Sequence, residues 1–136
     1  MIDVVVFEPG DLAPVLAALS PSGWVNLQPD VDTDAPPPRT AGVFGVFSAR
    51  GPAVPFCTWH PGERSVGIQH GTGPKLGRRI DVPPGWRITQ DHPKRGVVVR
   101  VADGTTDADA IGWLIRTAGP LCEVPLLGRW VAEVHS

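Results

Sequence analysis

Glycine and proline divide this chain into short segments and limit how long any helix or strand can become. The sequence holds 16 glycines and 16 prolines among 136 residues, which is about twice their usual combined share of roughly 12%. Proline fixes φ and lacks a backbone N–H donor, while glycine adopts turn conformations at little steric cost. We therefore predict many turns and short elements rather than long helices.

The remaining composition is that of a folded domain. Hydrophobic residues make up 42% of the chain and charged residues 19%, which suffices for a core and excludes a disordered tail. The longest aliphatic or aromatic runs, residues 4–7 and 15–19, are far too short to cross a membrane. Asp3 stands where a signal peptide would carry basic residues. We predict one soluble, cytoplasmic domain over residues 1–136, with no membrane contact.

Charge is small overall but unevenly distributed. The net charge is −2, so no global field attracts the chain to nucleic acid or lipid. Residues 1–38 hold six acids and no Lys or Arg, whereas residues 75–100 hold seven basic residues against two acids. This asymmetry indicates either an acidic and a basic surface or two ordinary solvated faces. Nucleic-acid binding is the weaker interpretation, because Trp86 is the sole aromatic residue in the basic stretch.

Short apolar runs bounded by Pro or Gly predict the strands, and apolar stripes at helical spacing predict the helices. The helix over 107–118 has the clearest signals, with Thr106 as N-cap, Asp109 in a capping box and Gly119-Pro120 as the stop. The predicted strands are 3–7, 24–28, 42–48, 54–59, 65–70, 86–91, 97–102 and 129–134, and the predicted helices are 11–19, 74–80 and 107–118.

The order of these elements predicts an α+β fold. Residues 61–136 read strand, helix, strand, strand, helix, strand, which is the ferredoxin-like βαββαβ plan. Residues 1–60 read as a degenerate βαβββ repeat of it, because 21–28 and 83–90 share four of eight residues at a constant offset. Chance similarity in a chain rich in Pro and Gly is the alternative. We expect antiparallel sheets with the helices packed on one face.

One edge of the ferredoxin-like half is the predicted ligand site. Strands 65–70 and 86–91 should end side by side, next to a glycine-rich turn whose free N–H groups favour an anion. Phosphate, a carboxylate or a nucleotide would suit it, although the turn is neither a P-loop nor a dinucleotide fingerprint. The alternative is a tight turn with solvated cations. The candidate residues are His70, Thr72, Gly73, Lys75, His92, Lys94 and Arg95.

The leading prediction is therefore a small binding or interaction module that recognises an anionic small molecule or a protein partner, with a homo-oligomer as a further option. The alternative is a small enzyme that uses His70 and His92 as acid and base. No cofactor is predicted. No metal site is predicted either, because Cys57 and His60 would point to opposite faces of a strand.

The tryptophans give a further prediction. Trp24 and Trp86 open matching strands, so we expect both in the core, packed against the helices. An aromatic floor beneath a ligand is the alternative. Trp113 lies off the apolar stripe of its helix and, if exposed, indicates a contact with a partner or a second copy.

Overall fold

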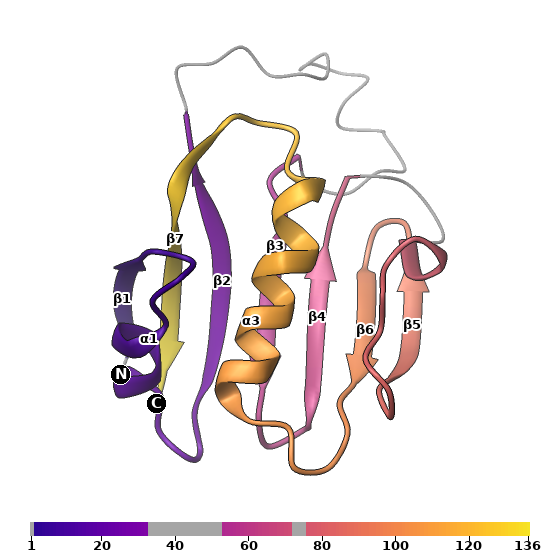
Figure 1. Ribbon diagram of the computed structural model, residues 1–136, viewed down its shortest axis with the longest axis horizontal. Helices are drawn as coiled ribbons and strands as arrows, with labels where there is room; N and C mark the ends of the chain where they lie inside the picture. The colour runs from indigo at the N-terminus through magenta and orange to yellow at the C-terminus, as the bar shows by residue number, and fades with distance from the viewer. Residues whose placement is uncertain (1, 33–52, 72–75) are drawn as a thin grey trace.

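One antiparallel sheet carries most of the elements of this protein. The structure, a computed structural model, describes residues 2–32, 53–71 and 76–136. Within them, seven strands follow the order β1-β7-β2-β3-β4-β6-β5 (Figure 1). The strands are β1 (Ile2–Phe7), β2 (Trp24–Val31), β3 (Phe56–His60), β4 (Ser65–Gln69), β5 (Arg87–His92), β6 (Gly96–Arg100) and β7 (Leu126–His135). The helices are α1 (Ala13–Ala18) and α3 (Asp107–Ala118), with short 3-10 turns η1 (Leu76–Arg78) and η2 (Gly119–Leu121).

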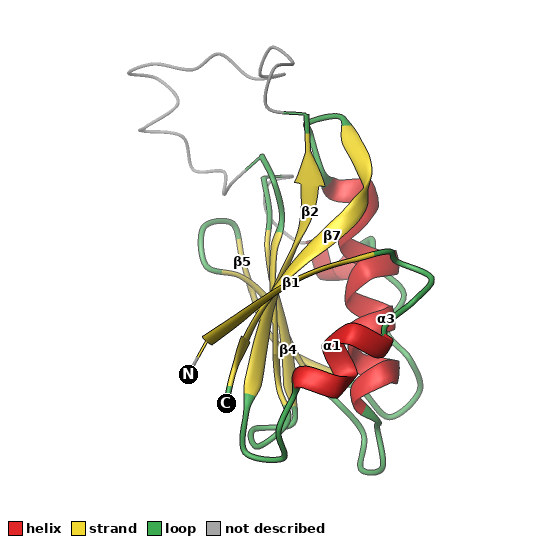
Figure 2. Ribbon diagram, turned by 90° about the vertical axis from the view of Figure 1, so that its left-hand side faces the viewer, coloured by secondary structure: helices red, strands yellow, loops and turns green. Residues whose placement is uncertain are grey.

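Both α-helices lie on the same side of the sheet (Figure 2). Helix α1 contacts β1 and β7, and α3 contacts β3 and β4. We call this side the helix face and the opposite side the open face, since no helix of the described residues covers it. The predicted α+β class, with helices packed against antiparallel strands, is confirmed.

Alternation along each strand directs apolar side chains to the helix face. In β3, Cys57 and Trp59 are buried, whereas Thr58 and His60 are only partly buried on the open face. The indole Nε1 of Trp59 donates a 2.9 Å hydrogen bond to Oδ1 of Asp107, the first residue of α3. The sheet and α3 therefore share one hydrophobic core.

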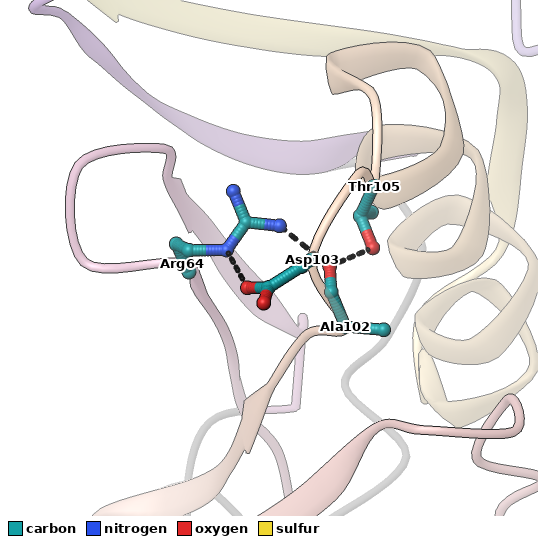
Figure 3. Close-up of polar contacts among 4 residues, drawn as sticks. All are labelled: Arg64, Ala102, Asp103 and Thr105. Atoms are coloured by element: carbon teal, nitrogen blue, oxygen red, sulfur yellow. Dashed lines mark hydrogen bonds and ion pairs between the residues drawn. The ribbon is translucent and has the colours of Figure 1, made fainter.

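The start of α3 is held by its own cap and by a neighbouring turn. Thr106 Oγ1 accepts the N–H of Asp109 at 3.1 Å, and the Asp109 carboxylate accepts the N–H of Thr106, so the predicted capping box is confirmed. Arg64, between β3 and β4, donates to the carbonyl of Ala102 and lies 3.4 Å from the carboxylate of Asp103 (Figure 3). These contacts tie the β3–β4 turn to the loop that leads into α3.

The predicted ferredoxin-like order of residues 61–136 is not confirmed. That plan places its last strand beside its first, which here would be β7 beside β4. Strands β4, β6 and β5 are arranged as expected, but β7 lies between β1 and β2. The reason is that β3 already pairs with β4 as a hairpin. Because β3 occupies that edge of β4 and β2 pairs with the other edge of β3, β7 pairs with the far edge of β2 and with β1.

The internal repeat is not confirmed either. At each end of the sheet two parallel strands flank an antiparallel one, as β1-β7-β2 and as β4-β6-β5. Residues that the repeat aligns nevertheless lie on opposite faces: Val4 is 68% exposed and its counterpart Val66 only 1%. Trp24 likewise faces the open side, whereas Trp86 packs against Trp113 of α3. Since a shift of one residue moves every side chain to the other face, the matched letters are not equivalent positions.

Two predicted elements fall wholly or partly outside the described residues. The strand over 42–48 lies outside them, as do residues 74 and 75 of the helix predicted over 74–80. The described remainder of that helix forms only the turn η1. Within it, the N–H of Gly77 donates to Asp91 of β5 at 3.0 Å, so η1 is fastened to the sheet.

Candidate functional site

The two predicted catalytic histidines lie at the carboxyl ends of β4 and β5, two parallel strands separated by β6, but point to opposite faces. Strands β4 and β5 both pair antiparallel with β6, so they run in the same direction. Their carboxyl ends therefore lie at the same end of the sheet, as predicted. His70 follows β4 on the side of buried Ile68 and is itself 1% exposed. His92 lies opposite Gly96, on the side of Val98 and the open face. Strand alternation therefore separates the two imidazoles, and they do not converge on one hollow.

His92 stabilises the turn that it begins. Its Nδ1 accepts the backbone N–H groups of Lys94 and Arg95, each at 3.1 Å. A nitrogen that accepts two backbone N–H groups is committed to closing the β5–β6 turn. This position does not favour the alternative of His92 as an acid or base in a reaction.

His70 is buried at the carboxyl end of β4, in surroundings that act on the pKa of its imidazole. Burial lowers the pKa of its imidazole, the carboxylate of Asp91 raises it to a smaller extent, and Arg79 lowers it further. Burial dominates because an imidazolium loses its hydration in an apolar environment.

We expect the free energy of unfolding to fall as the pH drops below about 6.5, the ordinary histidine pKa. The pKa of His70 is lower in the folded protein than in the unfolded chain, so the unfolded chain binds more protons in the window between the two values. Urea unfolding at several pH values from 7.5 down to 5 tests this. The matched variant His70→Gln should show a flatter dependence, and an unchanged slope would contradict the prediction.

The other predicted ligand residues are divided between described and undescribed segments. Thr72, Gly73 and Lys75 lie outside the described residues, so their role stays a prediction. Lys94 and Arg95 are exposed in the β5–β6 turn. Arg95 borders a shallow hollow of about 260 Å³ between β3, β4 and β6, on the open face.

A separate cleft lies on the helix side, where the C-terminal half of α3 meets the segment after η1. Its volume is about 380 Å³. One wall is Trp113, whose Nε1 donates a 2.9 Å hydrogen bond to the carbonyl of Asp81. We call it the arginine cleft, and it is lined by Leu76, Arg79, Ile80, Asp81, Trp113, Arg116, Thr117, Pro120 and Leu121.

The arginine cleft combines an apolar lining with two exposed guanidinium groups. Within the described parts of the chain, neither Arg79 nor Arg116 makes a side-chain hydrogen bond or an ion pair. A guanidinium nitrogen of Arg116 lies 3.0 Å from the point where a Cβ on Gly112 would stand, so this side chain folds back along α3. Asp81 adds one carboxylate to the lining. The cleft therefore carries two cations against one anion.

Sequence reasoning missed this cleft. Trp113 was expected to mark a contact surface if exposed, but it is 5% exposed and forms a wall instead. The spacing of Trp113, Arg116 and Thr117 on one helix was a signal, because residues three and four apart share a helix face. The opposite wall comes from Arg79, Ile80 and Asp81, and no local pattern places that segment beside α3.

Trp24 lies on the open face, not in the predicted core. Its ring stacks on His135 at 3.7 Å between centroids and on His60 at 4.9 Å. His135 in turn pairs with Glu133 at 2.7 Å. This stack crosses β7, β2 and β3 on the open face.

Cys57 and His60 lie on opposite faces of β3, as predicted. Burial raises the pKa of the Cys57 thiol, which disfavours the thiolate that binds metals or attacks substrates. In residues 2–32, 53–71 and 76–136, no group of three His, Cys, Asp or Glu side chains could hold a metal ion.

Comparisons with known proteins add no functional assignment. The chain matches no protein-family model, no curated protein and no solved structure. Across the described ranges, no helix has both the length and the hydropathy needed to span a membrane. Function is therefore inferred from the geometry alone.

Proposed function

We propose that this protein is a binding module that takes a small anionic ligand with an apolar part in the arginine cleft. The observation that carries the proposal is the pair Arg79 and Arg116, which have no side-chain partner among the described residues and border a cleft of about 380 Å³. The anionic ligand class agrees with the sequence prediction. The place differs, since it lies at α3 rather than between His70 and His92.

The chemistry of the lining supports this ligand class. A guanidinium group offers a planar fork of N–H donors that matches a phosphate or carboxylate, and Thr117 adds a hydroxyl on the same wall. Trp113, Ile80 and Leu121 provide apolar surface for the rest of the ligand. The volume falls in the range of about 300–1,000 Å³ typical of small-molecule sites.

Phenyl phosphate is a suitable probe because it joins a phosphate to an aromatic ring. We expect saturable NMR shifts of the Trp113 indole N–H and of the backbone amides around Arg79 and Arg116. Phenol, which lacks the charge, should give much weaker shifts. The double variant Arg79→Gln, Arg116→Gln should weaken binding tenfold or more, since each charge-assisted hydrogen bond contributes roughly 1.5–3 kcal/mol.

The matched control removes the same charge elsewhere. Arg87 and Arg100 face each other across β5 and β6 on the open face, so Arg87→Gln with Arg100→Gln lowers the net charge equally and leaves the cleft intact. Binding of phenyl phosphate should survive in this control. Equal weakening in both double variants would show nonspecific attraction to a basic surface, and an absence of saturable shifts at Trp113 would also overturn the proposal.

A further inference from the structure

Strand β1 presents an apolar row at the edge of the sheet. Its open-face side chains Ile2, Val4 and Val6 are 57%, 68% and 57% exposed, although large aliphatic residues usually avoid water. Figure 1 shows β1 as the outermost strand on the left, paired along one side with β7. Among the residues that the structure describes, its other side has no strand partner and offers the backbone N–H and C=O groups of an edge strand.

The edge of β1 carries one charged side chain, Asp3, which lies on the helix face. The register of β1 with β7 is continuous from Ile2 to Phe7, without a bulge, and the strand contains no Pro, Lys or Arg. Proteins usually shield an edge strand with a bulge, a proline or charged side chains. The opposite edge strand, β5, has such devices, because its register shifts between Ile88 and Gln90 and its exposed residues include Arg87 and Asp91.

We propose that β1 is a homodimer interface, at which the β1 strands of two copies pair antiparallel about a two-fold axis at Val4. This register places Val4 opposite Val4 of the second copy and Ile2 opposite its Val6. All three apolar pairs then lie on the same face. A register centred on Asp3 is disfavoured because it would place two carboxylates directly opposite each other.

We expect the partner of β1 to be the β1 strand of a second copy, because two identical apolar rows can pack against each other. The open-face side of β1 is uncharged, so two identical rows meet without like-charge repulsion, and the strand backbone supplies the hydrogen bonds. The bulged and charged β5 edge is a poor acceptor for β1, so pairing closes at two copies instead of growing into a fibre. A six-residue strand covers about 20 Å of edge. An interface of this size lies at the small end of specific complexes, so we expect micromolar affinity.

Sedimentation velocity from 1 µM to 1 mM tests the interface with any affinity tag removed. The wild-type protein should shift from monomer to dimer with rising concentration, and Val4→Lys should remain monomeric. The matched control Leu127→Lys makes the same kind of change at an exposed aliphatic residue of β7, 48% exposed, and should dimerise like the wild type. Far-UV circular dichroism establishes that each variant is folded. A wild-type monomer at 1 mM, or equal dimerisation of Val4→Lys, overturns the proposal.

Cysteine cross-linking tests the register. In a Cys122→Ser background, Val4→Cys should form a disulfide dimer on mild oxidation, because the two Cβ atoms face each other across the axis. Val6→Cys should not, because its counterpart lies four residues away along the strand, beyond the roughly 7 Å Cα separation that a disulfide can span. Preferential cross-linking at residue 6 contradicts the register, and failure at both positions contradicts the pairing.

Discussion

Gly96→Ala is expected to lower the free energy of unfolding by about 3 kcal/mol. Gly96 closes the β5–β6 turn with φ of +85°, a conformation that disfavours any residue with a Cβ. A Cβ at this position would also collide with the carbonyl oxygen of Ile68 in β4. Both effects act at one residue, so the substitution disturbs the turn and the pairing of β6 with β4 together.

Gly104→Ala separates the two contributions. Gly104 also has φ of +85°, but a Cβ there would meet nothing within 4 Å. We expect it to lose only the conformational contribution, about 1–2 kcal/mol. Urea unfolding of both variants measures the difference. Equal losses would mean that Ile68 moves aside and that the close packing of β4 on this turn contributes little to stability.

Trp59→Ala is expected to reduce the free energy of unfolding by about 3–5 kcal/mol. Trp59 is 2% exposed and is the largest fully buried side chain of the described residues. Its removal leaves a cavity between β3 and α3 and takes away the hydrogen bond to Asp107. Since α3 also carries Trp113 and Arg116, this variant should disturb the arginine cleft from the other end of the helix.

Trp59→Phe with Asp107→Ala isolates the hydrogen bond. Phenylalanine keeps much of the ring but has no indole N–H, so the single variant loses both the bond to Asp107 and some packing. In the Asp107→Ala background the same substitution should be less destabilising, by about 1–3 kcal/mol. An identical effect in both backgrounds would show that packing alone links β3 to α3.

Local features were predictable from the sequence because their causes lie within a few residues. Thr106 and Asp109 form the capping box that their spacing predicts. The connection between β5 and β6 is short and ends at Gly96, as its turn-forming residues indicate. The alternation in β3 correctly separates Cys57 from His60.

Features that depend on distant segments were not predictable. The position of β7 depends on the pairing of β3 with β4, which occupies one edge of β4. No pattern within residues 126–135 records that pairing. Trp113 lies off the apolar stripe of its helix, but Trp86 and Asp81 contact it from a neighbouring segment. The arginine cleft forms only because the segment 79–81 lies beside α3. His70 and His92 lie at the predicted end of the sheet. Side chains alternate between the two faces along a strand, so the position of each histidine in that alternation decides which face it occupies.

The placement of β7 between β1 and β2 has a consequence for biosynthesis. On the ribosome, residues 2–31 emerge long before residues 126–135, yet β1 makes no strand pairing in the described sheet except with β7. Within the described sheet, β1 therefore lacks its strand partner until β7 has been synthesised. Long-range pairing of this kind slows folding, and the apolar row of β1 makes this interval the stage at which we expect chaperone binding.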